Sequence, residues 1–167
     1  RLTLKYAITG HTSGIGKEIF SILPNAKGFS RSNGFDINNM ESRKDILNEI
    51  KDCNVFINNA HSNFAQTLML LDVFHNWKNT NKTIINIGSE IAEDKTILKN
   101  YEDLLEYQIQ KKSLKVLHYD LVALETNLNL KYVYFGYVGT DRILKKYPNM
   151  PREQYITVEE AVNKILK

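Results

Sequence analysis

The sequence contains only one cysteine, Cys53. A single thiol cannot form an internal disulfide, so a disulfide framework is excluded and a reducing compartment, the cytoplasm, is expected. Cys53 stands at the head of an apolar segment, and this position indicates a buried structural thiol.

Long hydrophobic runs are also absent. No apolar run is long enough to span a bilayer and no signal peptide precedes the first expected strand, so no membrane association is predicted. The net charge is only +3, with lysines and arginines scattered singly or in pairs, which is too sparse for a nucleic-acid-binding surface. No metal site is predicted, because the histidines are well separated in the sequence: His11, His61, His75 and His118.

A chain of 167 residues with 43% hydrophobic and 25% charged residues is typical of one globular domain, here residues 1–167. Strand and helix patterns alternate without a repeat or linker, which indicates an α/β fold with a doubly wound, mostly parallel sheet. The expected strands are Lys5–Thr9, Ala26–Ser30, Cys53–Asn58, Lys82–Ile87 and Lys131–Val138, with a very short one at Gly34–Asp36. The expected helices are Gly14–Leu23, Glu41–Lys51, Phe64–Lys78, Lys99–Glu125 and Val158–Leu166.

The most informative feature is a glycine-spaced turn between the first strand and the first helix. Gly10 makes the tight exit from the strand, Gly14 lets a phosphate approach the backbone, and Gly16 lets the helix pack closely on the strand. With the helix N-terminus, this turn predicts a site for the pyrophosphate of a dinucleotide. An ordinary turn that is rich in glycine is the alternative. The predicted cofactor contacts here are Gly10, Thr12, Ser13, Gly14, Ile15 and Gly16.

Residues suited to catalysis follow further along the chain. Ser89 ends a strand, where its hydroxyl can hydrogen-bond a substrate oxygen. Tyr107 and Lys111 are one helical turn apart and project from the same helix face. A lysine ammonium close to a phenol favours the phenolate, which suits acid/base chemistry. Taken alone, Tyr107 is better interpreted as a surface tyrosine of an amphipathic helix, but Lys111 beside it and Ser89 before it favour the catalytic role.

Five motifs follow one another along the chain: Thr9-Gly10-x-x-x-Gly14-Ile15-Gly16, Asn58-Asn59-Ala60, Ser89, Tyr107-x-x-x-Lys111 and Gly136-x-Val138-x-Thr140. In this order they resemble the short-chain dehydrogenase/reductase family. The resemblance implies a Rossmann fold and an oxidoreductase that interconverts a small-molecule carbonyl and an alcohol by hydride transfer. It implies that Tyr107 is the acid/base, that Ser89 orients the substrate and that Lys111 binds the nicotinamide ribose.

The resemblance also implies a fourth catalytic position, an asparagine that relays protons to the lysine. Asn63 is the nearest candidate, and a helix N-cap is the equal alternative for it. Further cofactor contacts are implied at Asn59 and Ala60, at Asp36 and Ile37 beside the adenine, and at Val138 and Thr140 beside the nicotinamide.

The end of the second strand favours NADP over NAD. A ribose 2′-hydroxyl is usually held by an acidic residue at this point, whereas a 2′-phosphate suits arginine. No acidic residue is present there, but Arg31 is, with the hydroxyls of Ser30 and Ser32 beside it. A solvated arginine on a loop is the alternative.

Several positions depart from the family pattern. His61 replaces the usual glycine after Asn-Asn-Ala, and Phe135 replaces the usual proline before Gly136. The substrate lid is reduced to about Asp141–Tyr155, and the usual terminal strand is not expected. These departures keep open a second function, a non-catalytic NADP-binding sensor or scaffold. A nucleotide-sugar epimerase is disfavoured, because the chain lacks a separate substrate domain.

The expected helix Phe64–Lys78 is apolar around most of its circumference. A helix on one face of a sheet needs only an apolar stripe, so the surplus predicts contact with a second subunit in a homo-oligomer. Burial beneath its own neighbouring helix and loops is the alternative.

Overall fold

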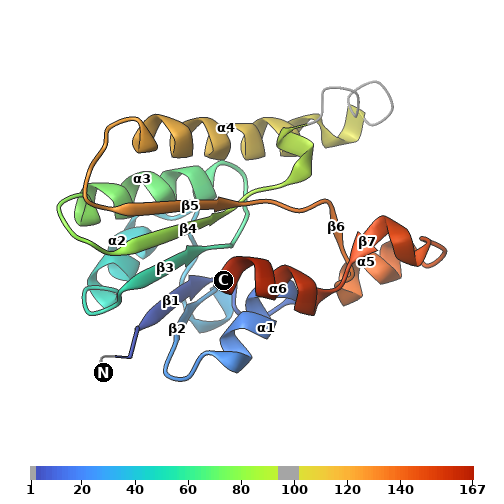
Figure 1. Cartoon of the computed structure of the whole chain (residues 1–167), viewed down its shortest axis with the longest axis horizontal. Coiled ribbons are helices and arrows are strands. Elements are labelled where there is room, and N and C mark those ends of the chain that lie inside the picture. The colour runs from blue at the N-terminus through green and yellow to red at the C-terminus, as the bar shows by residue number, and fades with distance from the viewer. Residues whose placement is uncertain (1–2, 94–101) are drawn as a thin grey trace.

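A computed structural model describes residues 3–93 and 102–167. Its centre is a sheet of five parallel strands in the order β2-β1-β3-β4-β5 (Figure 1). The strand order changes direction between β1 and β3, and in sheets of this kind ligands bind beyond the carboxyl ends of the strands at that point. The strands are β1 (Tyr6–Thr9), β2 (Lys27–Phe29), β3 (Val55–Asn58), β4 (Thr83–Ile87) and β5 (Asn129–Val133).

The central strands β3 and β4 consist almost wholly of buried residues. Successive side chains of a strand point to opposite faces of the sheet. Accordingly, Phe56 and Ile84 join the core on one face, and Ile57 and Ile85 join the core on the other. A near-continuous apolar run is therefore required here, and the expected doubly wound parallel sheet is confirmed.

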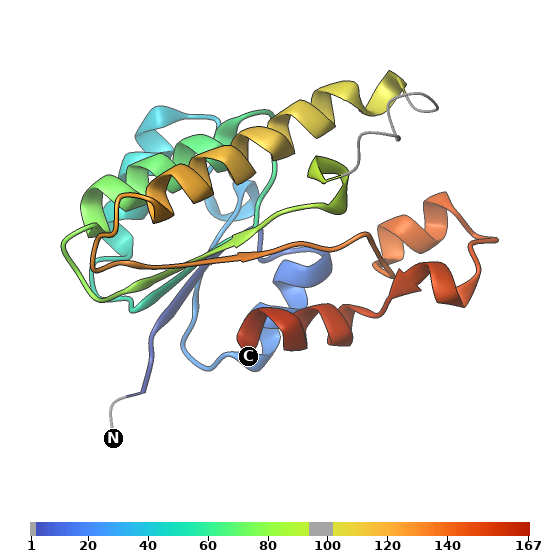
Figure 2. The same ribbon diagram turned by 45° about the horizontal axis from the view of Figure 1, so that its top comes forward.

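Helices cover both faces of the sheet, as Figure 2 shows. Leu70 and Leu114 are fully buried on one face, and Ile19 and Ile165 on the other. No helix in the described ranges combines the length and hydropathy needed to cross a membrane. The first face carries α2 (Met40–Glu49), α3 (Ala65–Trp77) and α4 (Leu105–Val122), and the second carries α1 (Gly14–Ile22) and α6 (Val158–Leu166).

Side chains fix helix α6 at both ends. At its start, Thr157 and Glu160 form a capping box, in which the Thr157 hydroxyl accepts a hydrogen bond from the Glu160 N–H at 3.0 Å. At its end, the Lys131 ammonium of β5 meets the negative pole of the helix dipole. It donates at 2.9–3.3 Å to the carbonyls of Lys164, Ile165 and Lys167.

The expected strand Lys131–Val138 is wrong in its length. Strand β5 covers only its first part, and a separate strand β6 (Tyr137–Val138) pairs with β7 (Tyr155–Ile156) in a second, two-stranded sheet. Between β5 and β6 the chain crosses the end of β4, where the Phe135 carbonyl accepts a hydrogen bond from the Glu90 N–H at 2.8 Å. This contact continues the pairing of the two segments just beyond β4 and β5, and the chain leaves the main sheet after it.

Two further expectations need correction. Residues Gly34–Asp36 form no strand; Gly34 has φ +93° and ends a short 3-10 helix, η1 (Arg31–Asn33). The expected helix Lys99–Glu125 is observed as η4 (Glu102–Leu104) followed directly by α4. Its first three residues lie outside the described residues.

Helix α3 is covered mainly by its own neighbours. Seven of its thirteen residues are buried, and α2 and α4 pack against it. Most of the α3 surface is thus buried beneath neighbouring helices of the same chain, which is the alternative given above to a subunit contact. Leu68 is an exception, at 43% exposed. A larger group of exposed apolar side chains lies on α4, and it comprises Leu105, Ile109, Val116, Tyr119 and Val122.

Candidate active site

The glycine turn between β1 and α1 has backbone conformations that favour glycine. The φ angle is +74° at Gly10 and +54° at Gly14. A Cβ on Gly16 would overlap the carbonyl oxygen of Gly10, so no larger residue fits where the helix passes the strand. Gly16 thus has the packing role that its spacing predicts, while the phosphate contact of Gly14 stays a prediction.

The N-terminus of α1 offers backbone hydrogen-bond donors at this turn. Ser13 is the N-cap, but its side chain makes no capping hydrogen bond to any described residue, and the first turn contains no acidic residue. The first N–H groups of a helix lack partners within the helix, and the helix dipole adds partial positive charge there. This end of α1 therefore suits an anion such as a pyrophosphate.

The end of β3 holds the turn in place. The Asn59 side chain donates to the carbonyls of Thr9 at 3.1 Å and Gly10 at 3.3 Å. The backbone N–H groups of Asn59 and Ala60 donate to the Thr9 hydroxyl at 3.2 and 3.0 Å. Asn59 and Ala60 thus lie at the turn, and their contact with a cofactor stays a prediction. Thr9 begins the motif of the glycine turn but was not predicted as a site residue, because its contacts with Asn59 and Ala60 depend on a distant part of the chain.

The end of β2 presents polar groups on helix η1. Ser30 is the N-cap of this helix, and its N–H donates to the Asn33 side chain at 2.8 Å. The hydroxyls of Ser30 and Ser32 lie 2.6 Å apart. Arg31 is exposed, and its guanidinium has no hydrogen-bond or ion-pair partner within the described part of the chain. An unpaired guanidinium beside two hydroxyls can bind a phosphate group.

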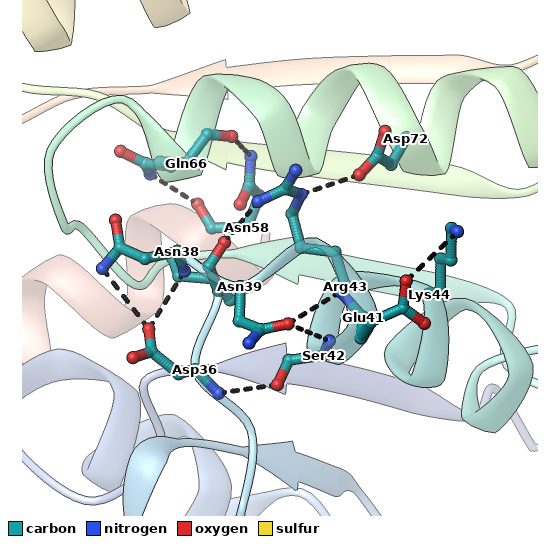
Figure 3. A network of polar contacts seen from close by, with 11 residues as sticks. Asp36, Asn38, Asn39, Glu41, Ser42, Arg43, Lys44, Asn58, Gln66 and Asp72 are labelled. Carbon is teal, nitrogen blue, oxygen red and sulfur yellow. Dashed lines mark hydrogen bonds and ion pairs between the residues drawn. The ribbon is translucent and has the colours of Figure 1, made fainter.

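Asp36 and Ile37 lie in the loop before α2. The Asp36 carboxylate accepts hydrogen bonds from the backbone and the side chain of Asn38, at 3.0 and 3.3 Å (Figure 3). Ile37 is buried in the core, and its carbonyl accepts a hydrogen bond from Arg43 at 2.8 Å. Arg43 in turn pairs with Asp72 of α3 at 2.8 Å. These contacts fix the loop, and they leave the Asp36 carboxylate partly exposed.

Helix α4 is fastened to the backbone on both sides of Ser89. The Lys111 ammonium donates to the carbonyl of Ile87 at 3.2 Å, and the Gln108 side chain donates to the carbonyl of Ile91 at 2.9 Å. Ile87 precedes Ser89 by two residues and Ile91 follows it by two. The two hydrogen bonds therefore bring the first turns of α4 against the carboxyl end of β4.

Ser89 itself caps the short helix η2 (Glu90–Ala92). Its hydroxyl oxygen accepts a hydrogen bond from the N–H of Ile91 at 3.3 Å, which leaves the hydroxyl proton for another acceptor. Tyr107 is half-buried in the first turn of α4, and the Lys111 nitrogen lies 5.9 Å from the centre of its ring. The same-face arrangement of Tyr107 and Lys111 is thus present.

Gln66 of α3 is the functional candidate that the sequence analysis missed. Its side-chain oxygen accepts a hydrogen bond from Lys111 at 2.9 Å, and its nitrogen donates to the carbonyls of Asn58 at 2.8 Å and Ile87 at 2.9 Å. Figure 3 shows the contact between Gln66 and Asn58. Because the bond to Ile87 uses the second amide hydrogen, the amide orientation is fixed. Helical spacing places position 66 among apolar neighbours, but no pattern indicates that it meets the lysine.

Burial lowers the pKa of Lys111 to about 8. The residue is only 4% exposed, and its acceptors on Gln66 and Ile87 are uncharged. Desolvation of the ammonium therefore decides the direction of the shift. The amine still carries its proton at neutral pH.

Asn63 does not cap α3, so that alternative is wrong. The N-cap is Phe64, and Asn63 has φ +50°, an exposed side chain and a hydrogen bond to the Asn38 side chain at 3.3 Å. In the described part of the chain, the hydrogen bonds of Lys111 go to Gln66 and Ile87. The relay role of Asn63 is thus a prediction that these contacts do not support.

Val138 and Thr140 lie on the other side of the glycine turn. The Thr140 hydroxyl caps α5 (Asp141–Lys146) by accepting the Ile143 N–H at 3.3 Å. A Cβ on Gly14 would lie 3.4 Å from the Thr140 methyl group, so Thr140 borders the turn. Val138 is buried, and its carbonyl accepts the Thr140 N–H at 2.7 Å. The chain then passes through η5 (Arg152–Gln154) to β7.

No protein-family model and no curated protein matches the sequence, but solved structures match the fold. One is a short-chain dehydrogenase from Burkholderia cenocepacia in complex with NADP, with a TM-score of 0.77 at 18% identity, covering 98% of this chain and 82% of that one. The 3-alpha-hydroxysteroid dehydrogenase from a Pseudomonas species, complexed with NADH, has a TM-score of 0.70 at 15% identity, covering 97% and 88%.

A small-chain dehydrogenase in complex with NADPH matches with a TM-score of 0.75 at 13% identity, covering 99% of this chain and 90% of that one. Identities this low establish the arrangement of the elements and not the chemistry. The chain therefore has the Rossmann-type fold of the short-chain dehydrogenases/reductases.

Proposed function

We propose that this protein is an NADP-dependent oxidoreductase of the short-chain dehydrogenase/reductase type, which interconverts a carbonyl and an alcohol with Tyr107 as the acid/base. One observation carries the proposal. Hydrogen bonds from Gln108 and Lys111 fasten the turn that bears Tyr107 to the backbone on both sides of Ser89. This contact lies at the carboxyl ends of the parallel strands, where the glycine turn also lies.

The residues present suit an NADP cofactor. The N-terminus of α1 offers donors to a pyrophosphate, and the unpaired guanidinium of Arg31, with the hydroxyls of Ser30 and Ser32, suits a 2′-phosphate. Residues 28–33 include no acidic side chain that would hold a 2′-hydroxyl. Because the similar structures contain NADP, NADPH or NADH, the preference for NADP rests on Arg31. The other expected contacts are Asp36, Ile37, Val138 and Thr140.

In the reducing direction, bound NADPH supplies a hydride to the carbonyl carbon. Ser89 donates its hydroxyl proton in a hydrogen bond to the carbonyl oxygen and holds that oxygen beside the phenol. Tyr107 transfers its proton to the same oxygen as the alcohol forms. The Lys111 ammonium, which is charged below its pKa of about 8, stabilises the resulting phenolate. Gln66 keeps the ammonium in place through its fixed amide oxygen.

The proposal is tested by NADPH oxidation with a panel of aldehydes and ketones. We expect turnover by the wild type and a loss of about a hundredfold or more in Tyr107→Phe, because the general acid is removed. Tyr6→Phe is the matched control, since Tyr6 lies at the amino end of β1, away from the carboxyl ends where Tyr107 and Ser89 lie. Equal rates in the wild type and Tyr107→Phe would remove Tyr107 from the mechanism. Tight NADPH binding without turnover of any carbonyl, alcohol or nucleotide sugar would favour the non-catalytic sensor or scaffold.

We also propose a homo-oligomer that forms through the exposed apolar side chains of α4, including Val116 at 60% exposure and Tyr119 at 51%. Burial of such a face against a second copy would remove apolar surface from water. Sedimentation analysis tests this, and a monomer at micromolar concentration would contradict it. The buried, unpaired thiol of Cys53 supports a reducing compartment such as the cytoplasm.

A further inference from the structure

His61 packs directly against Tyr107. The centroids of the two rings lie 4.9 Å apart and their planes meet at 81°, an edge-to-face arrangement. Aromatic pairs in this geometry attract each other beyond the effect of area burial. His61 comes from the loop after β3 and Tyr107 from the first turn of α4, so the contact joins two elements that are far apart in the sequence.

The neighbours of the imidazole are themselves fixed in place. The preceding residue, Ala60, is fixed by the hydrogen bond from its N–H to the Thr9 hydroxyl at 3.0 Å. The side chains of Gln110 and Gln66 lie close enough to the ring to influence its pKa, and Gln66 is itself fixed by its hydrogen bonds to neighbouring carbonyls. The ring is thus partly buried against Tyr107, on a loop whose start is fixed.

The imidazole is also uncharged under ordinary conditions. Burial and the nearby charge of Lys111 lower the pKa of His61 to about 4, and the charge of Arg142 lowers it slightly further. Gln110 and Gln66 favour the protonated ring, but their effect is smaller than that of burial. Above about pH 5, His61 therefore places no second positive charge beside Lys111. An aromatic ring can occupy this position without disturbing the charge balance around the phenol.

We propose that His61 is a positioning residue, which holds the phenol of Tyr107 in its reactive orientation through the edge-to-face contact. This inference rests on the proposed role of Tyr107 as the acid/base. It predicts that the shape of the ring matters and that its nitrogens do not. A substitution that removes the ring should slow the chemical step and leave NADPH binding unchanged, because His61 acts on Tyr107.

The kinetic test compares His61→Gly, which removes the ring, with His61→Phe, which keeps it. With the most reactive carbonyl of the panel, we expect kcat to fall by about tenfold in His61→Gly and to stay within about twofold of the wild type in His61→Phe. The dissociation constant of NADPH should be unchanged in both. Ser62→Gly controls for loosening of the loop and should retain its activity. Full kcat in His61→Gly, or equal losses in both variants, would overturn the role.

An NMR measurement decides the contact without any activity. In protein with isotope-labelled tyrosine, the signal lost in Tyr107→Phe identifies Tyr107 among the nine tyrosines. His61→Gly should shift that signal, because a ring current is removed, and His61→Phe should shift it much less. No shift in His61→Gly would overturn the inference. If the wild type binds NADPH but reduces no carbonyl, the proposed function is refuted. The NMR result still shows in that case whether His61 contacts Tyr107.

Discussion

The pH dependence of folding stability provides a sharp test of the buried lysine. Lys111 has a pKa of about 8 in the folded protein, against 10.5 in an exposed chain. Between these two values the unfolded state binds more protons than the folded state, so the free energy of unfolding rises with pH in that window. Below about pH 8 both states are protonated, and the penalty for burying the ammonium is present in full.

The size of the effect follows from the shift. Each pKa unit corresponds to about 1.4 kcal/mol, so Lys111 should add about 2 to 3 kcal/mol of stability between about pH 7 and pH 10. Lys111→Met fills nearly the same volume and does not titrate. The free energy of unfolding of this variant should therefore lack the rise with pH. The loss of the hydrogen bonds to Gln66 and Ile87 lowers its stability at every pH alike and does not produce such a rise.

Urea unfolding followed by circular dichroism at both pH values measures the difference between the two proteins. Other groups that titrate in this range are common to both and cancel in the comparison. Lys112→Met serves as the matched control, because Lys112 is the next residue but is only half-buried, and it should keep the wild-type rise. The reasoning is refuted if the wild type and Lys111→Met gain the same stability between the two pH values.

Three further predictions concern the cofactor site and the fold. Gly16→Ala should abolish detectable NADPH binding in a fluorescence titration, because the new Cβ would overlap the Gly10 carbonyl; wild-type affinity would contradict the packing at the turn. Arg31→Ala should lower the NADP affinity by about tenfold or more and leave NAD binding unchanged, and an unaltered ratio would show that Arg31 does not select the cofactor. Lys131→Met should destabilise the fold by about 1 to 2 kcal/mol in urea unfolding, since the end of α6 loses its charged donor; unchanged stability would argue against this cap.

Local patterns predict much of this fold. The apolar run at Val55–Ile57 and the glycine spacing from Gly10 to Gly16 each depend on neighbours close in the sequence. The turn is observed as expected, and the strand predicted over Cys53–Asn58 is observed as Val55–Asn58. The capping box of Thr157 and Glu160 is equally local, because its two residues lie within one helical turn. These features follow from steric and hydrogen-bonding rules that act within a few residues.

Features that depend on distant partners were not predictable in this way. The segment from Lys131 to Val138 is suited to strand throughout, yet it divides after Phe135, because β6 pairs with β7, which comes much later in the chain. Gln66 likewise acquires its role only because Lys111 lies against it across the helix pair. Contacts between residues far apart in the sequence leave no periodic signal in it.

The central claim is that Tyr107 delivers the proton while NADPH delivers the hydride. The most direct measurement uses NADPH that carries deuterium on the transferring face of the nicotinamide, with mass spectrometry of the alcohol product. The account predicts that the wild type transfers one deuterium to the carbonyl carbon and that Tyr107→Phe binds NADPH normally but transfers it at least about a hundredfold more slowly. Equal transfer by the two proteins, or bound NADPH with no transfer to any carbonyl, would contradict it.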